Sequence, residues 1–116
     1  MGDSITQGIG VPVEEREQFS YPAQLQVLLG DKYEVINCGR SGAYSVGPES
    51  KYKHPKPTAP SYSITQKYQE ALASEPDIVI FMLCANDART VTAENSEAVA
   101  ELYEAIKGYC EKMLCQ

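Results

Sequence analysis

Hydrophobic residues follow helical spacing in three stretches of the chain. The first covers residues 21–29, where a Ser-Tyr-Pro start precedes leucines at three- and four-residue spacing and a glycine follows. The second covers residues 62–74 and stops before a proline, since the residue preceding proline avoids helical backbone. The third covers residues 93–114, where apolar residues recur among glutamates and lysines. The apolar faces of these three helices comprise Leu25, Leu28, Leu29, Ile64, Tyr68, Ala71, Leu72, Val99, Leu102, Tyr103, Ile106, Tyr109 and Met113.

Two other stretches predict β-strands. Residues 33–38 have strand composition between turn-forming residues. Residues 77–83 form a continuous apolar run without alternation, which is typical of a parallel strand covered on both faces by helices. Strands that alternate with helices in this order predict an α/β fold of the doubly wound kind. Residues 43–60 contain four prolines and show no hydrophobic periodicity. This predicts a long surface loop of the kind that shapes a binding site.

Composition narrows the possible partners. A chain of 116 residues with 43% hydrophobic residues predicts one small domain with its own core. The net charge of −6 and the lack of a basic cluster argue against nucleic acid as a partner. No apolar run approaches the roughly 20 residues of a membrane span, so no membrane partner is expected. The cysteines show no metal-binding spacing, and we expect Cys38 and Cys84 to be buried thiols and Cys110 and Cys115 to point apart on the last helix.

Three short polar motifs follow predicted strands, where an open α/β sheet gathers its ligand groups. Gly2-Asp3-Ser4 offers a serine nucleophile, although a serine in such a turn also serves as a helix N-cap. Gly42 could present an uncovered backbone N–H to a developing oxyanion, or could be a turn residue only. Asn86 could add a side-chain amide donor, or could form an Asx turn. This layout indicates a hydrolase site.

The strings GDSITQG, YPAQLQVLLGDKYEVINCGRSG and EALASEPDIVIFMLCANDAR resemble the SGNH (GDSL-type) hydrolase family, particularly its sialate O-acetylesterase-like and carbohydrate esterase branch. The resemblance covers residues 2–89. It implies a flavodoxin-like three-layer α/β/α sandwich with a parallel sheet, of which residues 1–116 would be a partial SGNH hydrolase domain truncated at both ends. Its first strand is expected at the centre of the sheet, between residues 33–38 and 77–83.

The resemblance also assigns roles to particular residues. Ser4 matches the family's nucleophile, and the oxyanion hole would consist of the Ser4 backbone N–H, Gly42 and Asn86. Asp3 and Asp87 match the family's motif aspartates, for which we infer turn-stabilising roles. The resemblance implies no metal and no organic cofactor.

The sequence departs from the family pattern in three ways. Cys84 stands where the family's third motif usually has glycine, and only Met1 precedes the first motif in place of an apolar run. No aspartate is followed three residues later by a histidine, so the family's Asp-x-x-His block, which supplies the catalytic base, is missing. We therefore expect this chain to be a piece of a longer reading frame. His54 is a weak substitute base, since its proline- and lysine-rich loop offers no carboxylate to orient the ring.

The function predicted from these residues is a serine esterase of the SGNH type that hydrolyses carboxylic esters. The expected substrates are O-acetyl esters, on a small molecule or a glycan. The alternative is a non-catalytic remnant or binding module that keeps the scaffold without turnover. An Asp-x-x-His block downstream in the gene would favour the enzyme, and a stop codon after Gln116 would favour the remnant.

Overall fold

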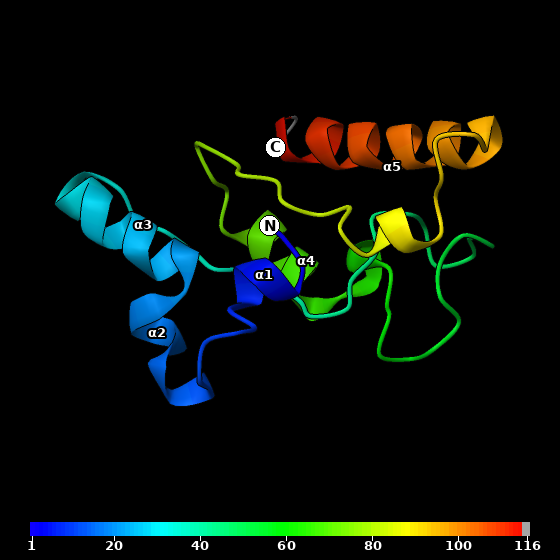
Figure 1. Cartoon of the computed structure of the whole chain (residues 1–116). Helices are drawn as coiled ribbons and strands as arrows, with labels where there is room; N and C mark the ends of the chain where they lie inside the picture. The colour runs from blue at the N-terminus through cyan, green and yellow to red at the C-terminus, as the bar shows by residue number, and fades with distance from the viewer. Residues whose placement is uncertain (115–116) are drawn as a thin grey trace.

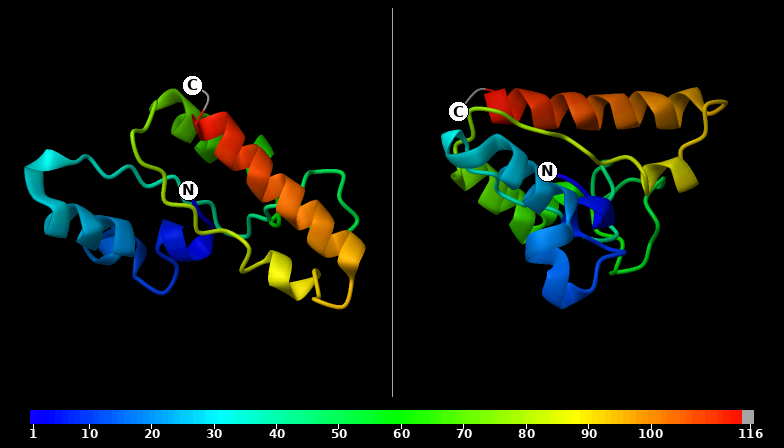
Figure 2. Two further views of the ribbon diagram at one scale, coloured as in Figure 1. Left: turned by 90° about the horizontal axis from the view of Figure 1, so that it is seen from above. Right: turned by 60° about the vertical axis from the view of Figure 1, so that its left-hand side comes forward.

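The computed structural model describes residues 1–114, and its regular elements are helices joined by extended segments (Figure 1). Views from different sides show α3 lying away from α5, with the extended segments crossing between them (Figure 2). The α-helices are α1 (Ser4–Gln7), α2 (Arg16–Phe19), α3 (Tyr21–Leu29), α4 (Gln66–Ala73) and α5 (Ser96–Leu114). Short 3-10 helices cover Val13–Glu15, Gly30–Lys32, Tyr62–Ile64 and Asp87–Arg89.

All three predicted helices are confirmed, and two of them start later than predicted. α3 spans the predicted residues 21–29. The predicted helix over 62–74 begins as a 3-10 turn and becomes α4 only at Gln66, because the extended Thr65 caps it by accepting a hydrogen bond from the Tyr68 N–H. α5 starts later than predicted, after Asn95, whose side-chain oxygen accepts from the Ala98 N–H at 3.1 Å. The short helices α1 and α2 were not predicted.

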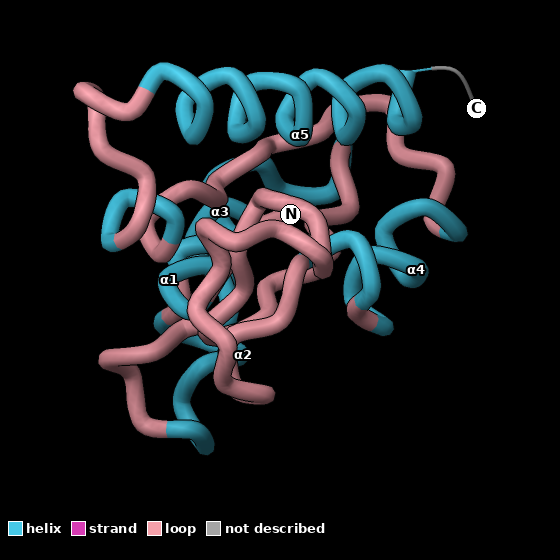
Figure 3. Tube along the Cα trace, turned by 90° about the vertical axis from the view of Figure 1, so that its right-hand side faces the viewer, coloured by secondary structure: helices cyan, strands magenta, loops and turns pink. Residues whose placement is uncertain are grey.

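The predicted sheet does not form within residues 1–114, and the three-layer sandwich is therefore absent from them (Figure 3). The prediction that residues 33–38 and 77–83 are strands is wrong, although Gly2 forms isolated parallel bridges with both Gly39 and Met82. The Gly2 carbonyl accepts from the Arg40 N–H at 2.9 Å on one side. On the other side, the Met82 N–H donates to the Met1 carbonyl at 2.9 Å.

These bridges confirm the expected central place of the first segment. They stop after one residue pair because residues 1–3 are too short to pair along both neighbours. Within the described chain, no backbone–backbone hydrogen bond joins residues 34–37 or 77–79 to another segment. Parallel ladders need a paired neighbour along their length, so these stretches remain extended without becoming strands.

The core is built around tyrosine side chains. The rings of Tyr62, Tyr68 and Tyr109 lie with centroids 5.3–6.0 Å apart in tilted or edge-to-face arrangements, and the Phe81 ring lies 5.5 Å from Tyr109. The Tyr62 hydroxyl donates to the Cys38 carbonyl at 2.5 Å. Burial raises the pKa of all three tyrosines, so their hydroxyls remain neutral donors. Cys38 is itself buried, as predicted.

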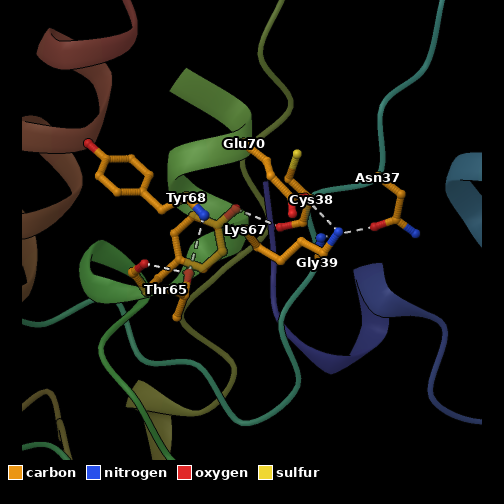
Figure 4. A network of polar contacts seen from close by, with 8 residues as sticks. Asn37, Cys38, Gly39, Thr65, Lys67, Tyr68 and Glu70 are labelled. Atoms are coloured by element: carbon orange, nitrogen blue, oxygen red, sulfur yellow. Dashed lines mark hydrogen bonds and ion pairs between the residues drawn. The ribbon is translucent and has the colours of Figure 1, made fainter. Parts of the chain in front are cut away.

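A network of polar contacts surrounds the start of α4 and the segment that bridges to Gly2 (Figure 4). The Asn37 side-chain oxygen accepts from the Gly39 N–H at 2.9 Å, and its amide donates to the Thr6 carbonyl at 2.8 Å. On α4, the Lys67 ammonium pairs with the Glu70 carboxylate at 2.6 Å. The two Asn37 contacts hold residues 37–39 next to α1.

Several apolar residues predicted to be covered are exposed. Phe81 and Leu83 pack on the core, but Ile78 and Ile80 are 66% and 49% exposed, so the prediction that residues 77–83 are covered on both faces is wrong. On the helices, the exposed members of the predicted apolar faces are Leu28, Leu29, Ile64, Val99 and Tyr103. A groove of about 480 Å³ lies beside Met1, lined by residues 33–36 and 76–80.

The groove suggests a stability test. Extending the chain upstream of Met1 by five apolar residues should raise the free energy of unfolding by about 2 kcal/mol. The added strand would pair with residues 33–38 on one side and 77–83 on the other and would bury apolar surface. Urea unfolding of the extended and unextended chains measures the difference. An extension of equal length made of serine and glycine is the control and should leave the midpoint unchanged. Equal midpoints for all three chains would show that the groove does not accept a strand.

Candidate active site

The three polar motifs meet at one edge of the bridged segments. Ser4 follows Gly2, Gly42 follows Gly39, and Asn86 follows Met82. Because Gly2 bridges both neighbours in parallel, the chain leaves all three segments in the same direction. The three motifs therefore follow the bridged segments on the same side, in the arrangement that the sequence predicts for a site at this end.

Ser4 begins α1 and is half-buried. The residue that caps this helix is Asp3, whose carboxylate accepts from the Ile5 N–H at 3.0 Å. The alternative in which Ser4 is the N-cap is therefore wrong, and its side chain is not engaged in capping. Asp3 is almost fully buried and turns the chain from the Gly2 bridge into the helix, which agrees with its inferred turn-stabilising role.

Gly42 occupies a position that only glycine fits. Its φ is +77°, and a Cβ atom would lie 2.1 Å from the Thr58 carbonyl oxygen. The neighbouring Ala43 N–H donates to the Arg40 carbonyl at 3.2 Å, so Gly42 also forms part of a turn. The loop that approaches it is closed by Lys53, whose ammonium donates to the His54 and Ala59 carbonyls.

Asn86 and Asp87 tie the third motif to the loop after Gly42. The Asn86 amide nitrogen donates to the Ala43 carbonyl at 3.0 Å, so the side chain spans two motifs and does not form an Asx turn. The fully buried Asp87 carboxylate accepts from the Ser45 N–H at 2.9 and 3.0 Å and from the Val46 N–H at 3.2 Å. Sequence reasoning missed Ser45 and Val46, because main-chain donors leave no signal in residue type.

Cys84 adopts a backbone conformation that favours glycine. Its φ is +81°, in the left-handed region that side chains with a Cβ rarely enter. Its sulfur lies 3.4 Å from the Ser45 hydroxyl oxygen. Burial raises the pKa of the Cys84 thiol above its usual range, and the nearby Asp87 and Asp3 carboxylates act in the same direction. The thiol is therefore protonated near neutral pH and is only half-buried, less than predicted.

His54 lies on an exposed loop, and its Nδ1 accepts from the Lys56 N–H at 3.2 Å. No ion pair within residues 1–114 joins its ring to a carboxylate. This environment is that of a solvated loop residue, as the sequence indicated.

Residues 1–114, which the structure describes, contain neither a cluster suited to a metal ion nor a helix suited to a membrane span. Among them, no group of three or more histidine, cysteine, aspartate or glutamate side chains could hold a metal ion. None of the described helices has the length and hydrophobicity that crossing a membrane requires.

Comparison with known proteins identifies the family. Residues 1–113 match the GDSL-like lipase/acylhydrolase family. This chain belongs to that family. It is also 35% identical over 108 residues to an acetylxylan esterase from Xylanibacter ruminicola, a match that covers 92% of this chain and 20% of that protein. The chain thus spans about a fifth of the length of this relative. No solved structure matches the chain.

Membership of the GDSL-like lipase/acylhydrolase family implies an α/β fold. The order of the bridged segments, with residues 1–3 between 39–40 and 82, is the part of that fold present in residues 1–114. The similarity to a protein named acetylxylan esterase agrees with the expected resemblance to the carbohydrate esterase branch of the family.

The strained backbone at Cys84 gives a direct prediction. Cys84→Gly should stabilise the chain by about 1 kcal/mol, because the cost of a left-handed non-glycine residue exceeds the entropy that glycine gains on unfolding. Urea or thermal unfolding measures the change. Cys84→Ala is the matched control, since it keeps the Cβ and removes only the sulfur contact with Ser45. A glycine variant no more stable than the alanine variant would show that the backbone conformation at this position costs little.

Proposed function

We propose that this chain is the nucleophile-bearing part of a serine esterase that removes O-acetyl groups from carbohydrate. The observation that supports it most strongly is the gathering of Ser4, Gly42 and Asn86 at one end of three parallel segments in a GDSL-like chain. An oxyanion hole requires hydrogen-bond donors held beside the nucleophile before the reaction begins. The Asn86 amide donates to the Ala43 carbonyl, directly after Gly42, and this link between the two proposed donors supports such an arrangement.

In the proposed reaction, the Ser4 hydroxyl oxygen attacks the ester carbonyl carbon. The oxygen that becomes negative would accept hydrogen bonds from the Ser4 and Gly42 N–H groups and from the Asn86 amide. The Asn86 amide has two hydrogens, and its contact with the Ala43 carbonyl uses one of them. The other remains for the oxyanion. As the tetrahedral intermediate collapses, the sugar oxygen leaves with the electron pair of the ester bond and takes up the proton given up by Ser4, which the base of the Asp-x-x-His block would transfer. Water then attacks the acetyl-serine, releasing acetate and restoring the Ser4 hydroxyl.

The catalytic base is the part of the mechanism that these residues do not supply. The Asp-x-x-His block of the family is not among the 116 residues, and His54 lies in an exposed loop without an orienting carboxylate. Without a base, the Ser4 hydroxyl keeps its proton and is a weak nucleophile. The second candidate function, a scaffold that does not turn over, follows from this observation.

We infer that the sugar is neutral. The similar protein from Xylanibacter ruminicola is named for acetylated xylan. The net charge of −6 on this chain also disfavours sialate, whose carboxylate would be repelled, relative to an uncharged polysaccharide. We therefore favour acetylated xylan-like polymers over O-acetyl sialate as the substrate class.

Turnover by the isolated chain tests the need for a base. Loss of one triad member in a serine hydrolase can lower kcat by on the order of 10⁶, so hydrolysis of an activated aryl acetate should be marginal. Release of p-nitrophenolate measures the rate. Ser4→Ala is the control for any residual activity. A rate near that of a complete family esterase, abolished by Ser4→Ala, would contradict the prediction and return attention to His54.

The role of Asn86 is tested in a longer protein that contains the Asp-x-x-His block. Asn86→Ala should lower kcat by roughly 10² to 10³ with little change in KM, since the amide acts on the developing oxyanion. Asn95→Ala is the matched control, because it removes the same amide from the start of α5, away from the three motifs. An unchanged kcat in Asn86→Ala would leave this residue a purely structural tie to Ala43.

A further inference from the structure

The Asp87 carboxylate is buried without a positive partner. Its side chain is fully buried, and no ion pair among residues 1–114 joins it to a lysine, arginine or histidine. Burial of a carboxylate is costly unless hydrogen bonds replace its hydration. Here the replacement comes from the Ser45 and Val46 N–H groups, which between them contact both carboxylate oxygens. Such charge-assisted bonds are stronger than bonds between neutral groups.

These bonds hold the loop that follows Gly42 against the segment that carries Asn86. Ser45 is held on three sides, with its N–H on Asp87, its hydroxyl 3.4 Å from the Cys84 sulfur, and its carbonyl accepting from the Tyr109 hydroxyl at 3.2 Å. At the near end of the same loop, the Ala43 carbonyl accepts from Asn86. The loop that follows Gly42 is therefore bound at Ala43 by Asn86 and at Ser45 and Val46 by Asp87. These contacts connect the two donors proposed for the oxyanion hole.

We infer that Asp87 is a positioning residue, which fixes the spacing between the Gly42 N–H and the Asn86 amide by binding residues 45 and 46. This inference rests on the proposed esterase function. It gives Asp87 a part beyond turn stabilisation, because its partners belong to the loop of a different motif. A donor displaced by about 1 Å can lower the rate of an enzyme by on the order of 10², so such a tether matters for chemistry as well as for folding.

The first measurement uses the unaltered chain. Amide hydrogen exchange followed by NMR should show the Ser45 and Val46 N–H groups protected by at least about tenfold relative to exposed loop amides, because both bond to a buried carboxylate. In Asp87→Asn this protection should fall, since the asparagine loses the negative charge and places an NH2 donor where one carboxylate oxygen accepts from the Ser45 N–H. Ser45 and Val46 amides that exchange as fast as exposed loop amides in the unaltered chain would overturn the inference.

The second measurement follows acetylation of Ser4 by p-nitrophenyl acetate with mass spectrometry, in a longer protein that contains the Asp-x-x-His block. The Ser4 oxygen forms a bond to the acetyl carbon, p-nitrophenolate leaves with the electron pair of the broken ester bond, and the serine proton goes to the histidine of the Asp-x-x-His block. Asp87→Asn should slow this step by about tenfold or more. Asn95→Ala is the matched control, since it removes an amide side chain that caps the start of α5 and makes no contact with residues 43–46. Its acetylation rate should stay within about twofold.

The outcomes separate the inference from the proposed function. Acetylation of Asp87→Asn at the same rate as the unaltered protein and Asn95→Ala would overturn the positioning role alone. An unaltered longer protein, with its Asp-x-x-His block, that is never acetylated at Ser4 would overturn the esterase proposal, and the positioning role with it. If Asp87→Asn does not fold, Asp87→Glu replaces it, because it keeps the charge and displaces the carboxylate by one methylene. Acetylation of that variant at the unaltered rate would equally overturn the inference.

Discussion

The close approach of backbone at Gly2 is the constraint on which the rest of the structure depends. Gly2 lies between Gly39 and Met82, and a Cβ atom there would stand 1.8 Å from the Thr6 hydroxyl oxygen and 2.8 Å from the Met82 carbonyl oxygen. Gly39 is equally confined, since its Cβ would lie 2.3 Å from the Gln7 nitrogen. Side chains at either position would push the three segments apart. The common direction in which Ser4, Gly42 and Asn86 leave these segments depends on this fit.

Tyrosine side chains pack the loops around the site and also supply partners for their buried backbone carbonyls. Tyr62 and Tyr109 fill the core with their rings and direct their hydroxyls to the Cys38 and Ser45 carbonyls. An aliphatic core would leave those carbonyls without partners at a cost of about 1–3 kcal/mol each. The two hydroxyls therefore join the packed interior to the backbone at Cys38 and Ser45, which lie before and after Gly42 in the sequence.

Sequence patterns predicted the helices well and the strands poorly, for a physical reason. A helix satisfies its own backbone, so the leucine spacing of α3 and the cap at Thr65 act locally. A strand depends on a neighbour, and residues 33–38 and 77–83 have only residues 1–3 between them. The positions of Ser4, Gly42 and Asn86 could be predicted from motif order. The Asp87 contacts could not, since they join a side chain to main-chain groups in a distant loop.

The aromatic core has an optical consequence. The chain contains eight tyrosines and no tryptophan, so tyrosine alone dominates its near-ultraviolet signal. Rings held at 5.3–6.0 Å in fixed, inclined orientations couple their electronic transitions, which gives circular dichroism in that region. That signal arises in the cluster that joins α4, α5 and the loop after Gly42. The protein therefore contains an intrinsic spectroscopic probe whose intensity reports the packing of the very residues that support its site.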